Sequence, residues 1–248
     1  MDEQIFVQRT DLTALNEAVT SIRNEIKRII VGQDEMVKLI IAALLADGHV
    51  LIEGVPGVAK TLTAKLVARS INVGFSRIQF TPDMMPSDVL GTPVFNPKEA
   101  SFDFKKGPVF SNIVLIDEIN RAPAKTQSAL FEIMEERQAT IDGKTHLMDM
   151  PFMVLATQNP IEQEGTYRLP EAQLDRFLFK ILVPYPTEQE EIAILNQFHQ
   201  MGNTAALDTV KPVLNAHQIV SLRQQIRTLI IEEKLLHFSG MPFLKFLE

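Results

Sequence analysis

The sequence has no cysteine among its 248 residues, and its basic residues are in the minority. The absence of cysteine excludes disulfides and thiolate metal sites, and it fits a reducing compartment. With 24 Lys and Arg against 31 Asp and Glu, the formal net charge is −7. A chain of this charge lacks the broad basic surface that binds phosphate backbones, so nucleic acid is disfavoured as the main partner.

Long apolar runs and a targeting segment are also missing. The longest uninterrupted apolar run covers residues 39–46, which is far too short to span a bilayer. The N-terminal stretch MDEQIFVQRT carries acidic residues where a signal peptide needs a basic region followed by apolar residues. We therefore expect a cytoplasmic protein with no membrane insertion. The five histidines are scattered, and no two of them have metal-ligand spacing.

Short apolar runs of strand length alternate with helical patterns along the chain. The runs cover residues 49–53, 75–80, 112–116, 152–157 and 178–183, and helical periodicity appears at 12–30, from 34, at 60–70 and at 123–137. Buried strands that alternate with helices are typical of a parallel sheet covered on both faces. The pattern predicts an α/β fold with three layers, α/β/α, around a five-stranded parallel sheet.

Two intervals interrupt this alternation, and a third region follows it. Residues 81–110 are rich in Pro, Asp and Gly and are interpreted as an insertion, whose Phe95, Phe102 and Phe104 either pack internally or contact a partner. Residues 138–148 alternate around Asp-Gly at 142–143, which predicts a hairpin. After Val183 the pattern becomes helical. We therefore expect an α/β core at residues 1–184 and a helical segment at 185–248.

A glycine-containing loop between the first strand and the following helix predicts a phosphate-binding site. Backbone N–H groups in such a turn converge on phosphates, Lys60 supplies charge to the β- and γ-phosphates, and Thr61 places its hydroxyl on Mg²⁺. The residues expected to bind the nucleotide here are Gly54, Val55, Pro56, Gly57, Val58, Ala59, Lys60, Thr61 and Leu62.

The strict pattern for this loop has glycine before the lysine, where this chain has Ala59. Alanine is tolerated there if its φ angle stays negative, so we expect a negative φ. The alternative interpretation of the segment is an ordinary surface turn before a helix.

Acidic and amide side chains end two of the predicted strands. Asp117 would hold Mg²⁺ through its water shell, and Glu118 would polarise the water that attacks the γ-phosphate. Asn159 could hydrogen-bond that water or a γ-phosphate oxygen without adding charge. Alternatively, the acids belong to a solvated turn and Asn159 ends its strand because Pro160 follows. The acids and the glycine loop together favour nucleotide hydrolysis.

Long sequence segments closely resemble the MoxR family of AAA+ ATPases. These are residues 30–33 (IVGQ), 54–61 (GVPGVAKT), 80–83 (FTPD), 86–88 (PSD), 117–122 (DEINRA), 134–138 (MEERQ), 156–167 (ATQNPIEQEGTY) and 169–177 (LPEAQLDRF). The resemblance covers about residues 30–183. It implies a P-loop NTPase fold followed by a helical lid, and alanine before the lysine is usual in that family.

The resemblance also implies how such a protein would assemble. AAA+ proteins typically form hexameric rings with ATP between subunits, so a homo-hexamer is expected if the lid is complete. Arg176 matches the family's position for the arginine that enters the neighbouring site, while Arg121 and Arg137 are rivals for that role. The alternative for Arg176 is a surface salt bridge to Asp175 or Glu171.

Further roles follow from the same resemblance. Gln33 lies where the family contacts the nucleotide, and a separate von Willebrand factor A domain protein and a protein client are the implied partners. The lid segment whose arginine senses the γ-phosphate has no match between residues 183 and 248, so we expect an incomplete lid.

The leading hypothesis is an ATPase that uses ATP and Mg²⁺ to remodel protein complexes during maturation or metal-cofactor insertion. The alternative is a nucleotide-regulated scaffold with little turnover. A GTPase or small-molecule kinase is disfavoured because no Asn-Lys-x-Asp segment occurs. A nucleic-acid motor is disfavoured by the charge balance.

Overall fold

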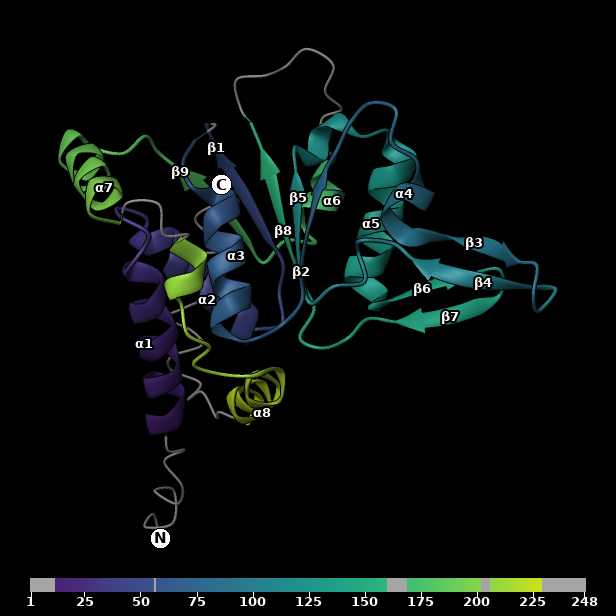
Figure 1. Cartoon of the computed structure of the whole chain (residues 1–248), viewed down its shortest axis with the longest axis horizontal. Coiled ribbons are helices and arrows are strands. Elements are labelled where there is room, and N and C mark those ends of the chain that lie inside the picture. The colour runs from purple at the N-terminus through teal and green to yellow at the C-terminus, as the bar shows by residue number, and fades with distance from the viewer. Residues whose placement is uncertain (1–11, 56, 160–168, 202–205, 229–248) are drawn as a thin grey trace, which may run out of the picture.

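The computed structural model describes residues 12–55, 57–159, 169–201 and 206–228. Its centre is a parallel five-stranded sheet with the strand order β2-β5-β8-β1-β9 (Figure 1). The strands are β1 (Val50–Gly54), β2 (Phe75–Gln79), β5 (Ile113–Asp117), β8 (Met153–Gln158) and β9 (Phe179–Val183). All five were predicted from the apolar runs, to within two residues at each end. The α/β fold with a five-stranded parallel sheet is confirmed.

The middle of the sheet is inaccessible to solvent because strands lie on both sides and helices cover both faces. Every residue of β5 is buried, and β1 pairs with β8 and β9, so that Val50 stands opposite Leu155 and Phe179. Continuous apolar runs are typical of strands buried on both faces. This arrangement brings the carboxyl ends of β1, β5 and β8 to one edge of the sheet.

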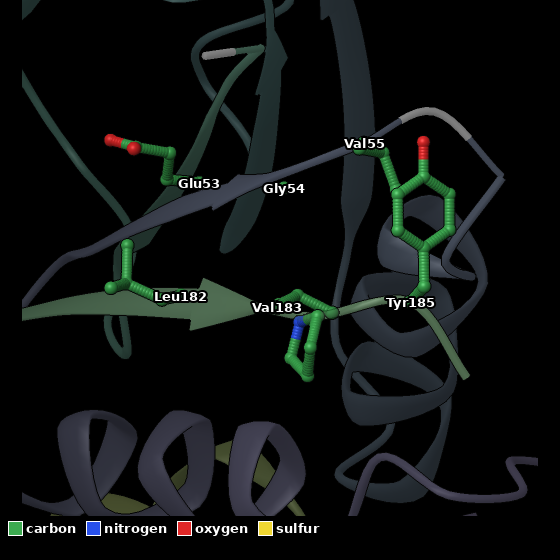
Figure 2. Close-up of a pocket in the computed structure, with 7 residues that line it drawn as sticks. Glu53, Gly54, Val55, Leu182, Val183 and Tyr185 are labelled. Carbon is green, nitrogen blue, oxygen red and sulfur yellow. The ribbon is translucent and has the colours of Figure 1, made fainter. Parts of the chain in front are cut away.

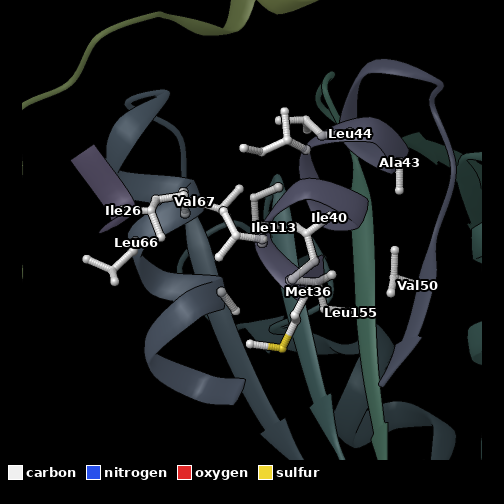
Figure 3. Close-up of a cluster of buried hydrophobic side chains, with 14 of the residues drawn as sticks. Ile26, Met36, Ile40, Ala43, Leu44, Val50, Leu66, Val67, Ile113 and Leu155 are labelled. Carbon is white, nitrogen blue, oxygen red and sulfur yellow. The ribbon is translucent and has the colours of Figure 1, made fainter. Parts of the chain in front are cut away.

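One face of the sheet is covered by α1 (Thr13–Lys27), α2 (Asp34–Leu45) and α3 (Lys60–Ser70). Their apolar side chains form a single cluster with the strand residues that point to this face (Figure 3). Ile40 of α2 and Leu66 of α3 are fully buried in it. The opposite face carries a second cluster, which includes Leu130 and Ile133 of α5 (Ala124–Glu136). The protein is therefore three-layered, as predicted.

The insertion and the hairpin lie beside one another and extend away from the sheet (Figure 1). The insertion contains α4 (Pro86–Leu90), β3 (Gly91–Asn96) and β4 (Ser101–Lys106), and the hairpin consists of β6 (Gln138–Ile141) and β7 (Lys144–Leu147). Phe104 packs against both Phe110 and His146, which joins the two units. Phe95 and Phe102 contact each other but remain 53% and 66% exposed. Phe104 is thus packed between the insertion and the hairpin, whereas Phe95 and Phe102 pack against each other and stay largely exposed.

The remaining elements are η1 (Ile119–Arg121), α6 (Glu171–Leu174), α7 (Glu188–Met201), η2 (Ala206–Thr209) and α8 (Ala216–Arg227). Helix α8 lies at the amino end of the sheet, where buried Arg223 donates to Leu44 O and pairs with Asp47. Ile219 and Leu222 of α8 belong to the same apolar cluster as α2 and α3. Because this helix shares a core with the α/β layers, the domain boundary at residue 184 stays a prediction. Within the described ranges, no helix has the length and apolar character to cross a membrane.

Candidate functional site

The loop between β1 and α3 is fixed to the core by its apolar side chains. Val55 and Val58 are 7% and 6% exposed and belong to the cluster beneath α2 and α3, and half-buried Leu62 packs against it. Gly57 has a φ of +90°, a conformation that glycine adopts without strain. With these side chains directed inward, the loop can present its backbone to a ligand. Pro56 lies outside the described residues.

Ala59 departs from the expectation drawn from its sequence. Its φ of +57° and ψ of 19° are left-handed, whereas a negative φ was expected. The residue is the N-cap of α3, and its carbonyl accepts a hydrogen bond from Thr63 N at 2.9 Å. A left-handed conformation costs alanine energy because of its methyl group, a strain that glycine would avoid.

Lys60 is the first residue of α3, and its ammonium group lies under the loop. Its Nζ donates to Gly54 O at 2.7 Å. Burial lowers the pKa of Lys60 from its ordinary value, while the charges of Asp117 and Glu118 oppose this shift. The lysine is thus half-buried within the electrostatic reach of both acids.

A pocket of about 180 Å³ brings the predicted chemical groups together at the carboxyl edge of the sheet. It is lined by Gly57, Lys60, Thr61, Arg77, Gln79, Asp117, Glu118, Thr157 and Asn159. The loop, the two acids and the strand-end amide are far apart in the sequence, yet they line one pocket because β1, β5 and β8 are neighbours in the sheet. Six of the residues predicted for the site are among these nine.

Three residues in this pocket were missed by the sequence interpretation, namely Arg77, Gln79 and Thr157. Arg77 Nε lies 2.5 Å from Asp117 Oδ2, and Thr157 Oγ1 donates to Asp117 Oδ1 at 3.1 Å. Gln79 Nε2 donates to Glu118 Oε2 at 2.8 Å. The signal for Arg77 and Gln79 was their alternation with apolar residues on β2, which places polar side chains on one face of a strand beside β5.

The turn after β5 orients the second acid. Glu118 has a left-handed φ of +56°, and its backbone N–H donates to Thr157 Oγ1 at 3.0 Å. Its carboxylate also pairs with Arg121 Nε at 2.8 Å. Contacts from β2 and η1 therefore define where this carboxylate points, and the contact from β8 holds the backbone of the turn.

The donor set in the pocket suits a hard divalent cation. Thr61 offers a hydroxyl oxygen and Asp117, which is 7% exposed, offers a carboxylate, and Mg²⁺ prefers such oxygen ligands. In the described ranges there is no group of three or more His, Cys, Asp or Glu that could hold a metal by itself. A magnesium ion at this place would therefore depend on phosphate oxygens and water for most of its ligands.

Two further hollows lie at the carboxyl end of β9. One, of about 510 Å³, lies between the end of β1 and Tyr185, with Gly54 and Val55 in its wall (Figure 2). The other, of about 230 Å³, contains Gln33 and Met36. The two share Leu182, Val183 and Pro184 as lining residues. Gln33 is thus near the loop but outside the pocket that holds Lys60.

The three candidate arginines have different surroundings. Arg176 follows α6, is 42% exposed and pairs with Glu135 at 2.6 Å, rather than with Asp175 or Glu171. It does not line the pocket with Lys60. Arg137 is engaged inside its own subunit, where it donates to Asp47 O at 2.7 Å and Phe152 O at 2.9 Å, which disfavours it as an interface residue. Arg121 lies beside Glu118 of its own chain.

Comparisons with known proteins identify the family of this chain. The family described as "ATPase family associated with various cellular activities (AAA)" matches residues 49–179, just over half of the chain. Chaperone MoxR1 of Mycobacterium tuberculosis is 53% identical over 200 residues, which cover 81% of this chain and 52% of that protein. The uncharacterized protein YeaC of Bacillus subtilis is 47% identical over 210 residues, covering 85% and 65%.

A crystal structure gives the same result for the fold. A candidate ATPase from Cytophaga hutchinsonii superposes with a TM-score of 0.77 at 43% sequence identity, covering 90% of this chain and 69% of that one. The present chain spans 52% and 65% of the length of the two relatives named above.

Proposed function

Because this chain belongs to the MoxR family of AAA ATPases, we propose that its pocket binds ATP with Mg²⁺ and hydrolyses it to ADP and phosphate. The observation that carries the proposal is the convergence of Lys60, Thr61, Asp117, Glu118 and Asn159 on one pocket. A lysine, a hydroxyl, two acids and an amide are the kinds of group that hold the phosphates and the metal and position the attacking water in NTPases.

Each residue has a separate task in this proposal. The backbone of residues 54–62 and the N-terminus of α3 hold the phosphates, and Lys60 adds a positive charge to them. Mg²⁺, when bound, supplies further positive charge to the phosphate oxygens, held by Thr61 and by Asp117 largely through water. Glu118 accepts the proton of the attacking water, and Asn159 orients that water or a phosphate oxygen.

The adenine end of the nucleotide is assigned to the hollows beyond the loop. Gln33 lines one of them, and the loop residues Gly54 and Val55 line the other. Pockets for purine rings are largely apolar with few polar groups, and the side chains of Leu182 and Tyr185 supply apolar surface here.

Arg176 is proposed to complete the site of a neighbouring subunit in a homo-hexameric ring. Its exposure, and its position outside its own chain's pocket, support a role in trans. A guanidinium group would neutralise charge that develops on the γ-phosphoryl group.

We further propose that hydrolysis drives remodelling of a protein client. This proposal rests on chaperone MoxR1 as a relative, of which the chain covers about half. The proposed partners are a von Willebrand factor A domain protein and a client in complex maturation or metal-cofactor insertion. The exposed Phe95 and Phe102 offer a client apolar surface.

Paired substitutions test the enzymatic proposal. Lys60→Ala should abolish ATP binding in calorimetric titration with Mg²⁺, because the phosphates lose their main cation. Glu118→Gln should retain binding but reduce turnover by about 10²- to 10⁴-fold, the usual contribution of a general base. Glu132→Gln, an exposed acid on α5, is the matched control and should leave turnover unchanged. Binding without turnover in the unaltered protein would favour the regulated scaffold instead.

A further inference from the structure

We propose that Glu135 is the positioning residue for Arg176: it fixes the direction in which this guanidinium leaves the subunit. The inference rests on the proposed function, because it assigns a residue to the arginine that serves the neighbouring site. Glu135 does not line the pocket with Lys60, and none of the roles proposed above involves it.

Two contacts from one face of α5 hold the segment around Arg176. Glu135 Oε1 lies 2.6 Å from Arg176 Nη1. Phe131 lies one helical turn earlier and packs edge-to-face against Phe177, with ring centroids 6.0 Å apart at 84°. Residues at i and i+4 share a helix face, so an ionic contact and an apolar contact act on adjacent residues from the same side.

The apolar contact fixes the backbone, and the ionic contact fixes the side chain. Phe177 is only 8% exposed and belongs to the cluster that includes Leu130 of α5. The backbone of this turn is closed by a hydrogen bond from Phe177 N to Leu174 O at 3.0 Å. Arginine has many rotamers when exposed, so a fixed backbone alone leaves its guanidinium unrestrained. Glu135 provides the restraint.

The anchoring helix is itself well fixed. Gln127 Nε2 donates to Ile119 O at 3.0 Å and to Ala122 O at 3.1 Å, and Thr126 Oγ1 donates to Met84 O at 2.7 Å. These contacts hold the first turn of α5. The last turn, which carries Glu135, is held by buried His49, whose Nε2 donates to Met134 O at 3.0 Å. Glu135 is therefore a defined reference point for the Arg176 guanidinium. Precise orientation matters because a misplacement of about 1 Å can cost about 100-fold in rate.

The test is a double-substitution cycle in steady-state ATP hydrolysis, with Glu135→Gln, Arg176→Ala and the double variant. Glu135→Gln should lower kcat by about 3- to 30-fold, within the cost of misplacing a catalytic group, while KM changes less than about twofold. Glu135→Asp should recover part of the loss. The double variant should be no slower than Arg176→Ala alone, because Glu135 acts only through that arginine. Glu136→Gln, the neighbouring exposed acid, should match the unaltered protein.

Other results would overturn the inference. An unchanged kcat in Glu135→Gln would mean that the ion pair does not contribute to catalysis. A higher kcat would mean that the ion pair holds Arg176 away from its catalytic position. Losses that multiply in the double variant, or an equal loss in Glu136→Gln, would mean that Glu135 acts by another route.

Failure of the proposed function is a separate result, seen as no turnover in the unaltered protein. The same variants are then compared by urea unfolding. If the shift in the urea midpoint of the double variant differs from the sum of the two single shifts, Glu135 and Arg176 interact in the folded protein, as the inference requires. Additive shifts would overturn the inference.

Discussion

Protonation of His49 should destabilise the fold progressively as the pH falls from about 6.5 towards 3. The side chain is 3% exposed, lies against Phe152, and makes two hydrogen bonds with backbone groups. Val154 N donates to Nδ1 at 2.9 Å, so Nε2 carries the proton and donates to Met134 O at 3.0 Å. A second proton would remove the acceptor that Val154 needs.

Burial is the main reason why the imidazole resists this proton. It lowers the pKa of His49 from 6.5 to about 3, Arg137 and Arg223 lower it further by repulsion, and the Met134 hydrogen bond opposes the shift. Because the unfolded chain binds the proton more readily, stability rises with pH between these two values. Relative to pH 8, the free energy of unfolding should fall by about 2 kcal/mol at pH 5 and about 3 kcal/mol at pH 4 from this residue alone.

Urea unfolding from pH 4 to 8 measures this contribution. His49→Gln should be less stable than the unaltered protein at pH 8, since it cannot reproduce both hydrogen bonds, but its stability should depend less on pH. His217→Gln, at an exposed position on α8, should reproduce the pH profile of the unaltered protein. Identical pH profiles for His49→Gln and the unaltered protein would refute the assignment of a buried, neutral imidazole.

Three other substitutions probe the loop, the sheet end and the site. Ala59→Gly should raise the free energy of unfolding by about 1 kcal/mol without weakening nucleotide binding, because it relieves the left-handed alanine; a loss of stability would contradict this. Asp47→Asn should cost about 3–5 kcal/mol in urea unfolding, since it leaves Arg223, 5% exposed, without a charged partner. A loss of less than about 1 kcal/mol in the free energy of unfolding would mean that the Asp47–Arg223 ion pair does not stabilise the fold. Thr157→Val should cost about 1–3 kcal/mol and slow ATP turnover, because the Glu118 N–H loses its acceptor; full activity would argue against that role.

The strands and helices were predictable because burial on both faces gives continuous apolar runs. Helix α3 follows from its helical periodicity, and the hairpin around residues 142–143 follows from the Asp-Gly turn signal. The φ angle of Ala59 was predicted with the wrong sign, because residue type sets only a preference and the loop geometry overrides it. The roles of the predicted site residues stay predictions. Part of the segment that resembles the MoxR family (residues 160–168) and the end of the expected lid (residues 229–248) lie outside the described residues.

Contacts between distant segments could not be predicted from local sequence. Arg77 and Gln79 reach the acids only because β2 pairs with β5 in a register that sets Gln79 opposite Asp117. Arg137 was placed among the interface candidates, whereas its guanidinium contacts Asp47, 90 positions away in sequence. Pairing register and long-range side-chain contacts are set by the assembled core, and no motif encodes them.

The hydroxyl of Thr157 has a consequence for how the site responds to its ligand. It is bonded to the carboxylate of Asp117 and to the amide of Glu118, and it lies two positions before Asn159 along the same segment. If a phosphate oxygen displaced the end of β8, the hydrogen bonds of Thr157 would therefore shift both Asp117 and Glu118. If the pocket binds ATP as proposed, the hydroxyl of Thr157 would couple the position of Asn159, next to the terminal phosphate, to the positions of Asp117 and Glu118.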